Sequence, residues 1–170
     1  MSLLPYNEIP STPEQVSAPN TIARFVDGLG FRYRWATENF TQNEIDFCPV
    51  EGSMDMMQLI RHLYQLAHIS NKTFGGLEEL DRSLKTFDEI RLATLQNLIE
   101  LSTRLKSMTD DELKICTIHL RRRNNDYAFW YVLNGPIADA LTHVGQITSW
   151  RRIAGNPQPS GVDVFEGTIN

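Results

Sequence analysis

The chain has 170 residues, of which 41% are hydrophobic, and its formal net charge is −5. This length and composition suffice for one globular domain that buries its own core. The negative charge excludes a broad basic surface for DNA, RNA or an anionic membrane, and no run of about 18 apolar residues predicts a membrane span.

Three further features bear on the compartment and on partners. The first five residues lack the basic and apolar segments of a signal peptide, which predicts a cytoplasmic protein. Cys48 and Cys116 match no CxxC pattern and are expected to be free thiols in a reducing cytoplasm. The one basic run, Arg121 to Arg123, is followed at once by a polar cluster at 124–126, so we interpret it as the charged turn of a hairpin.

Residues 1–19 are predicted to form an extended N-terminal lead-in, because they hold four of the eight prolines and few periodic apolar residues. A helical domain is expected over 20–170. Its first helix should begin near Asn20, and a 3.6-residue apolar period marks its core face: Ile22, Phe25, Val26, Leu29, Tyr33, Ala36 and Phe40. Gly28 and Gly30 each weaken this helix by about 1 kcal/mol relative to alanine, so packing must sustain it. The sequence from Thr41 to Glu44 is a capping box that predicts one short turn.

Two more amphipathic helices follow. Ser53 can cap the second, which should run to about Phe74, and the capping box from Thr86 to Glu89 begins the third. The core face of the second helix is predicted to be Met56, Leu59, Leu63, Leu66, Ser70 and Phe74. That of the third is predicted to be Phe87, Ile90, Thr94, Leu98, Leu101 and Leu105.

The period changes between residues 114 and 128, where β-branched residues alternate and then a turn cluster follows. This pattern predicts a short hairpin or an extended excursion. The final helix is expected over about 135–154, with Pro136 at its first helical position, and it stops before Gly155. An extended tail should reach Asn170. Four long amphipathic segments predict an all-α fold, an antiparallel-type four-helix bundle.

The last predicted helix carries a candidate metal-binding pair. Asp139 and His143 are four residues apart, so they differ by only about 40° around the helix axis and project together. Carboxylate and imidazole groups suit several divalent metals. His62, at the edge of the apolar stripe of the second helix, is the best candidate for a third ligand. Three protein ligands would leave a coordination position open, as in catalytic sites; the alternative is a hydrogen-bonded surface pair.

The other polar positions on these helices receive different interpretations. His68 lies about 120° from His62 around the helix and is expected to face solvent, and His119 is expected to be an exposed strand residue. The predicted core stripe of the last helix is Ile137, Leu141, Val144 and Thr148. A second stripe beside it holds Asp139, His143, Gln146 and Trp150. Because this second stripe lies off the core centre, we expect the site near the mouth of the bundle.

Two segments resemble motifs of one known family. They are Leu59-Ile-Arg-His62-Leu and the stretch Leu133–Pro157, which contains His143-Val-Gly-Gln146, Trp150-Arg-Arg and Gly155-Asn-Pro. From about Thr21 to the tail, the chain resembles the DinB-like superfamily of bacterial four-helix-bundle proteins. By this resemblance His62 and His143 match metal ligands, and Asp139 stands where the family usually has a histidine.

The resemblance implies a metal-dependent enzyme, either a hydrolase or a transferase of low-molecular-weight thiols. Its cofactor would be a divalent ion, Zn²⁺, Ni²⁺, Mn²⁺ or Fe²⁺, that makes a bound water or thiol nucleophilic at neutral pH. Gln146 and Trp150 would position or shield a small-molecule substrate, unless they serve only ordinary packing. The alternative is a non-catalytic, dimeric binding protein, in which Trp35 and the cluster 129–131 are core or interface anchors.

Overall fold

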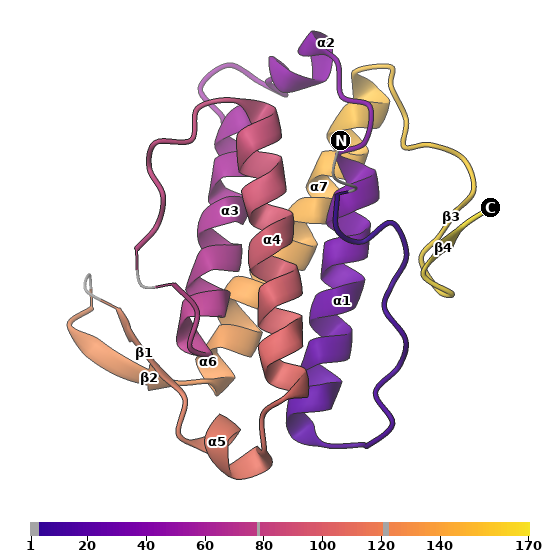
Figure 1. Cartoon of the computed structure of the whole chain (residues 1–170). Helices are drawn as coiled ribbons and strands as arrows, with labels where there is room; N and C mark the ends of the chain where they lie inside the picture. Colours follow the sequence, from indigo (N-terminus) through magenta and orange to yellow (C-terminus); the bar gives the residue numbers. More distant parts are fainter. Residues whose placement is uncertain (1–3, 78, 121–122) are drawn as a thin grey trace.

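Four long helices form the body of the protein. The computed structural model describes residues 4–77, 79–120 and 123–170. The long helices are α1 (Ala18–Ala36), α3 (Met56–Thr73), α4 (Phe87–Lys106) and α7 (Ala138–Ile153), and they pack side by side (Figure 1). The predicted all-α four-helix bundle is therefore confirmed. Residues 1–3 and the first two arginines of the basic run lie outside the described residues. Among the described residues, no helix is long and apolar enough to cross a membrane.

The order of the helices differs from a simple antiparallel bundle. α1 and α3 each pack against α4 and α7. α3 and α4 run parallel, because the crossover at residues 74–86 carries the chain back along the bundle before α4 begins (Figure 1). The side-chain amide of Asn71, late in α3, accordingly donates to Oδ1 of Asn97 in the second half of α4, at 3.0 Å. The antiparallel-type arrangement was wrong for this pair, since a long crossover allows parallel neighbours.

Capping residues define most helix ends. The capping boxes of Thr41 with Glu44, which begins α2 (Gln42–Ile45), and of Thr86 with Glu89, which begins α4, are confirmed. The predicted cap of α3 was wrong. The Ser53 hydroxyl donates to the carbonyl of Val50 at 2.7 Å, and Asp55 caps α3 instead. A carboxylate two residues closer to the helix thus replaces a hydroxyl that the preceding turn already uses.

α1 begins two residues before the predicted start and ends at Ala36 rather than near Phe40. The Thr37 hydroxyl donates to the carbonyl of Tyr33, and Asn39 adopts a left-handed conformation with φ of 56°. These two features turn the chain out of the helix. Phe40 still contributes to packing, because its ring stacks on Phe87 at 5.2 Å.

The predicted core faces of α3 and α4 are buried, except that Phe87 is half-buried. On α1, Phe25 was wrongly assigned to the core, since its side chain is 58% exposed. It borders a surface depression together with Val164 and Phe165 of the C-terminal segment. On the predicted last helix, Ile137 and Val144 are buried as predicted, whereas Leu141 and Thr148 are half-buried. Burial at these positions depends on neighbouring segments of the chain, and helical periodicity does not reveal those segments.

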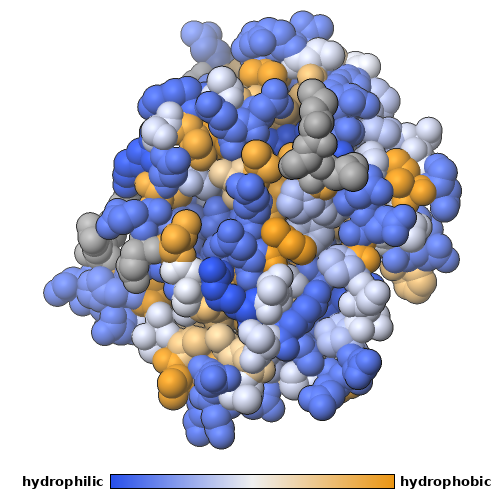
Figure 2. Space-filling model, viewed as in Figure 1, coloured by the Kyte–Doolittle hydropathy of each residue, from blue (hydrophilic) through white to orange (hydrophobic). Residues whose placement is uncertain are grey.

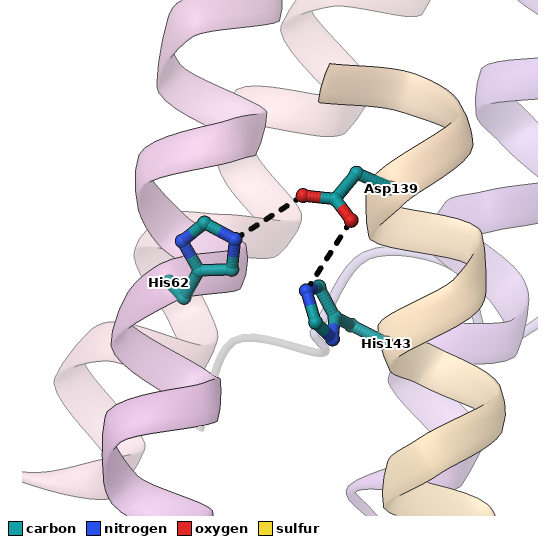
Figure 3. A group of neighbouring side chains, drawn as sticks. All are labelled: His62, Asp139 and His143. Atoms are coloured by element: carbon teal, nitrogen blue, oxygen red, sulfur yellow. Dashed lines mark hydrogen bonds and ion pairs between the residues drawn. The ribbon is translucent and has the colours of Figure 1, made fainter. Parts of the chain in front are cut away.

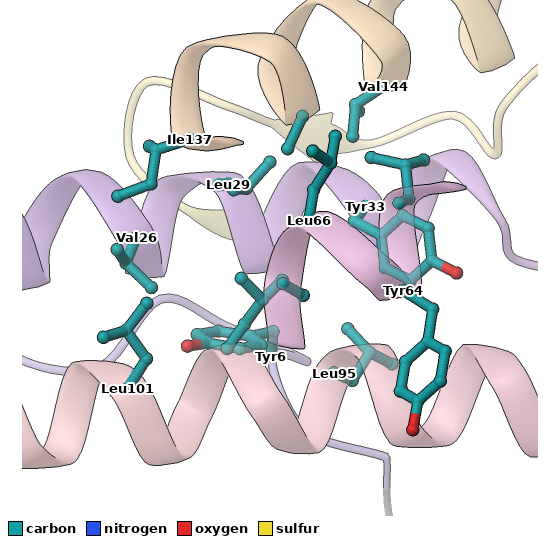
Figure 4. Packing of buried hydrophobic residues seen from close by; sticks show 14 of the residues in the cluster. Tyr6, Val26, Leu29, Tyr33, Tyr64, Leu66, Leu95, Leu101, Ile137 and Val144 are labelled. Atoms are coloured by element: carbon teal, nitrogen blue, oxygen red, sulfur yellow. The ribbon is translucent and has the colours of Figure 1, made fainter. Parts of the chain in front are cut away.

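The N-terminal lead-in is extended but is held firmly on the bundle. The Tyr6 ring is 4% exposed and lies among core residues of α1 and α4 (Figure 4). Its hydroxyl donates to Oδ1 of Asp27 at 3.2 Å, and Lys106 forms an ion pair with the same carboxylate at 2.7 Å. The backbone N–H of Ile9 donates to the carbonyl of Gly167, which joins the two ends of the chain.

Short elements connect α4 to α7. The structure adds α5 (Asp110–Lys114), which the sequence analysis did not predict. The predicted hairpin is confirmed as an antiparallel pair, β1 (Thr117–Leu120) with β2 (Asn125–Ala128). After α7, the tail that was expected to be extended forms a small second hairpin, β3 (Val162–Asp163) with β4 (Thr168–Ile169).

The last helical stretch begins earlier than predicted, at Trp130. It consists of α6 (Trp130–Val132), the π-helical turn η1 (Leu133–Ile137) and α7. Pro136 lies inside the π-turn rather than at a helix start, and the N–H of Ala138 donates to the carbonyl of Leu133, five residues back. Proline has no N–H and its ring collides with an α-helical carbonyl four residues earlier, so a wider turn accommodates it.

The surface is mostly hydrophilic on the face seen in Figure 2, where hydrophobic side chains appear in small groups. Of the predicted aromatic anchors, Trp35 and Phe129 are buried in the core. Trp130 and Tyr131 are exposed, at 64% and 59%. Both cysteines are free thiols, as predicted.

Candidate metal centre

His62, Asp139 and His143 converge between two helices. His62 projects from α3, and Asp139 and His143 project from consecutive turns of α7, because positions four apart share a helix face (Figure 3). One donor atom from each residue can be chosen so that all three atoms lie within 4.8 Å of one another. The structure thus brings together the three residues that the sequence analysis singled out, including one from a different helix.

The Asp139 carboxylate lies between the two imidazoles. Its Oδ2 is 3.2 Å from Nε2 of His62, and its Oδ1 is 3.4 Å from Nε2 of His143. The two rings are nearly perpendicular, with centroids 5.0 Å apart. Metal–ligand bonds of about 2.0–2.2 Å place donor atoms roughly 3.0–3.6 Å apart in tetrahedral or octahedral sites. The two distances run to different oxygens of Asp139, and one donor atom from each residue lies within 4.8 Å of the others, so the side chains would have to draw closer together to hold a small divalent ion.

A hydrogen bond fixes the tautomer of His143. Its Nδ1 lies 2.9 Å from Oε1 of Gln146, one turn later on α7. An amide oxygen only accepts, so Nδ1 carries the proton and the Nε2 of a neutral ring presents a lone pair. That lone pair faces the Asp139 carboxylate. A metal ion between these two acceptors would satisfy both, so the donor set fits a divalent ion; in a doubly protonated ring, Nε2–H donates to the Asp139 carboxylate instead.

The site was expected near the mouth of the bundle but lies on its side. α6 and η1 extend the helical stretch before α7, so Asp139 and His143 sit near the middle of its length, as His62 does on α3. The three side chains are partly exposed, at 33% for His62, 44% for Asp139 and 19% for His143. The three side chains are therefore not deeply buried.

The π-turn before α7 affects where these ligands point. A π-turn adds one residue to the helix, which rotates all later side chains by about 100° relative to an uninterrupted α-helix. Asp139 is the second residue of α7, directly after this shift. Pro136 therefore helps to set the direction in which Asp139 projects toward α3.

The two remaining predicted site residues on α7 differ in position. Gln146 contacts His143 and is half-buried, consistent with a positioning role. Trp150 lies two turns beyond His143, is 8% exposed and packs against Phe47 with ring centroids 6.0 Å apart. These contacts are those of ordinary packing rather than of a substrate-binding side chain.

The other histidines lie outside this cluster. His119 is exposed on β1, as predicted, and its Nδ1 lies 2.8 Å from Oδ1 of Asp126 on the paired strand. His68 was wrongly expected to face solvent and is only 7% exposed. β1 packs against α3 on this side and covers it. The helix period could not show this, because the covering strand is about 50 residues away in sequence.

Comparison with known proteins supports the fold. No protein-family model and no curated protein matches the sequence. The solved structure of YfiT from Bacillus subtilis, described as a probable metal-dependent hydrolase with an unusual four-helix bundle topology, is similar with a TM-score of 0.58. The match covers 86% of this chain and 94% of YfiT at 18% sequence identity. The chain therefore has a four-helix-bundle fold similar to that of YfiT.

Proposed function

We propose that this protein is a metal-dependent hydrolase that acts at His62, Asp139 and His143. The observation that carries the proposal is the gathering of three donor atoms from two helices within 4.8 Å, in a fold similar to that of YfiT. A divalent ion held there would supply Lewis acidity, which lowers the pKa of a coordinated water and so provides a hydroxide nucleophile at neutral pH.

The residues of the chain have separate roles in this proposal. His62 and His143 donate through Nε2, and Asp139 contributes negative charge that offsets the charge of the cation. Gln146 holds the Nδ1 proton of His143 and so keeps Nε2 available. Three protein ligands leave at least one coordination position for water or substrate, as in catalytic rather than structural sites.

Transfer of a low-molecular-weight thiol is the second reaction that fits this ligand set. A thiol bound at the open position would be deprotonated as a water would. The two reactions differ in co-substrate, so product analysis with and without an added thiol separates them. Hydrolysis without thiol supports the hydrolase, whereas turnover that requires thiol and yields a thioether supports the transferase.

The proposed metal site can be tested by measuring the amount of metal bound to the protein after purification without a histidine tag. After loading with Zn²⁺, Ni²⁺, Mn²⁺ or Fe²⁺, we expect near-stoichiometric binding of at least one ion. His143→Ala should abolish most of this binding, because it removes one donor. His119→Ala is the matched control, since His119 is exposed and lies outside the cluster. Undiminished binding in His143→Ala rules out this assignment, and no retained ion under any loading condition favours the non-catalytic, dimeric alternative.

A further inference from the structure

Two adjoining pockets are lined by α3, further along this helix than His62. One of about 540 Å³ is lined by α3, the crossover after α3 and the β1–β2 hairpin. The other, of about 230 Å³, is lined by α3, the same hairpin, α6 and the π-turn. They share four lining residues, Ile69, Ile118, Leu120 and Arg123, and we call the combined space the hairpin pocket.

The hairpin pocket and the metal centre lie along the same two helical stretches, α3 and the stretch from α6 to α7. Ile69 is seven residues after His62, so it lies about 10.5 Å further along α3 and only about 20° around its axis. Gln65, which also lines the pocket, stands between these two positions. On the opposite wall, Asn134 to Pro136 line the pocket, directly before Asp139. A molecule that reaches from the metal centre into the pocket would therefore span about 10 Å.

The pocket combines an apolar floor with a basic rim. Ile118 is buried, and Ile69, Leu80 and Leu120 are half-buried around it. Arg82 and Arg123 are exposed at the rim. In the part of the chain that the structure describes, no hydrogen bond or ion pair engages either guanidinium group.

Other charged groups line the same space. Lys72 and Glu79 also line it. Among the described lining residues, the two rim arginines outnumber the one carboxylate, on a chain of net charge −5. Guanidinium groups match carboxylates and phosphates, because their N–H donors form paired hydrogen bonds with two oxygens.

We propose that the hairpin pocket binds the anionic end of the substrate. The substrate class is a small molecule in which an apolar segment separates a carboxylate or phosphate from the reacting bond by about 10 Å. The apolar segment lies on the floor, and Arg82 and Arg123 bind the anion. This inference rests on the proposed function for the reaction at the other end, but anion binding can be measured without it.

Calorimetric titration of the metal-free protein measures that binding separately from catalysis. The ligands are hexanoate, hexyl phosphate and, as the neutral match, 1-hexanol. We expect at least one anion to bind about tenfold or more tightly than the alcohol. Arg82→Gln and Arg123→Gln should each weaken anion binding about three- to tenfold and leave the binding of hexanol unchanged. The preference between hexanoate and hexyl phosphate identifies the anionic group.

Arg152→Gln is the control, because it removes the same charge from an exposed residue at the far end of α7. Circular dichroism verifies that each variant is folded. Equal affinity for the anions and hexanol, or equal weakening in all three variants, overturns the proposal.

A second measurement separates the pocket from the reaction. The metal-loaded protein is compared on p-nitrophenyl octanoate and on mono-p-nitrophenyl suberate, which carries a carboxylate at its far end. We expect a lower KM for the suberate ester, and Arg123→Gln should remove that advantage. Ion-dependent hydrolysis without such a preference overturns the pocket and leaves the proposed function standing. Anion binding that Arg123→Gln weakens, without ion-dependent hydrolysis, upholds the pocket and overturns the proposed function.

Discussion

Asp139 is the residue in which the candidate site departs from a three-histidine centre. Both of its carboxylate oxygens face imidazole nitrogens, Oδ2 toward His62 and Oδ1 toward His143. The same geometry suits a metal ligand and a hydrogen-bond acceptor that orients the two rings. The arrangement of the side chains therefore leaves two roles for this residue, and they make opposite predictions.

Asp139→His distinguishes those roles in one titration. If Asp139 is a ligand, the variant should bind Zn²⁺ and Ni²⁺ more tightly, because imidazole is the better donor for both and the spacing on α7 is unchanged. If Asp139 only orients His143, the substitution removes an acceptor and should weaken binding about tenfold or more. We expect tighter binding. A clear loss of affinity for both ions would assign Asp139 the orienting role.

At the scale of single elements, α1 shows how packing overrides helix propensity. Gly28 and Gly30 both lie within this helix, where alanine is favoured by about 1 kcal/mol. A β-carbon at position 30 would overlap the Tyr6 ring, which the lead-in places against the helix. A β-carbon at position 28 would meet only the end of the flexible Arg32 side chain, at 3.2 Å. The two glycines thus have different reasons to be present.

Gly30→Ala should destabilise the protein by about 1–3 kcal/mol, because overpacking exceeds the gain in propensity. Gly28→Ala is the matched variant and should be neutral or stabilising by up to about 1 kcal/mol. Urea denaturation followed by circular dichroism measures both free energies of unfolding. Equal effects of the two substitutions would show that the Tyr6 contact does not constrain α1.

The contact between α1 and α4 depends on a carboxylate shared by two arginines. Glu38, just after α1, forms ion pairs with Arg34 and with Arg91 of α4. Burial raises the pKa of Glu38, but the hydrogen bonds from Arg91 and Arg34 outweigh this and hold the pKa below its ordinary value of 4.5. The lowered pKa means that the charged carboxylate stabilises the fold. That contribution is complete above pH 4.5 and is lost as the pH falls through the lowered value.

Glu38→Gln should therefore cost about 2 kcal/mol at pH 7, because it leaves two largely buried guanidinium groups without a counter-charge. The cost should shrink as the pH falls well below 4.5, where the wild-type residue is itself neutral. Denaturation at a series of pH values measures the difference. Glu51→Gln is the control, since Glu51 is exposed in the loop before α3. A difference that does not change with pH would contradict this account.

At the scale of the whole molecule, the bundle core holds the candidate ligands in place without help from an ion. α3 and α7 pack against each other through buried residues such as Leu66 and Val144 (Figure 4). Arg151, fully buried on α7, donates to the carbonyls of Trp35 and Ala36 and so fastens α7 to the end of α1. Metal binding should accordingly add to stability without being required for folding.

Chelation of the ion should lower Tm but leave the helical circular dichroism spectrum unchanged. An ion present at 100 times its Kd stabilises by about 2.7 kcal/mol, which raises Tm by roughly 5–10 °C in a domain of this size. His143→Ala should show no such shift on addition of the ion. Loss of helicity on chelation would show that the ion is structural, and a spectrum dominated by strand would contradict the bundle itself.

Features that depend on neighbours along the chain could be predicted from the sequence. Apolar period located the four long helices, and the capping boxes at Thr41 and Thr86 located two helix starts to the residue, because a cap needs only side chains three positions apart. The spacing of Asp139 and His143 likewise predicted their shared face. The choice of His62 as third partner rested on the edge of an apolar stripe and on the family resemblance.

Features that depend on segments distant in sequence could not be predicted and became visible in the folded chain. The parallel pairing of α3 with α4, the burial of His68 under β1 and of Tyr6 against Gly30, and the π-turn at Pro136 all follow from contacts or geometry that periodicity does not record. The hairpin pocket is the clearest case, since Arg82 and Arg123 come from a loop and a hairpin turn with no spacing rule between them. Local spacing fixes the direction of side chains within one helix, whereas packing of the whole chain decides which side chains meet.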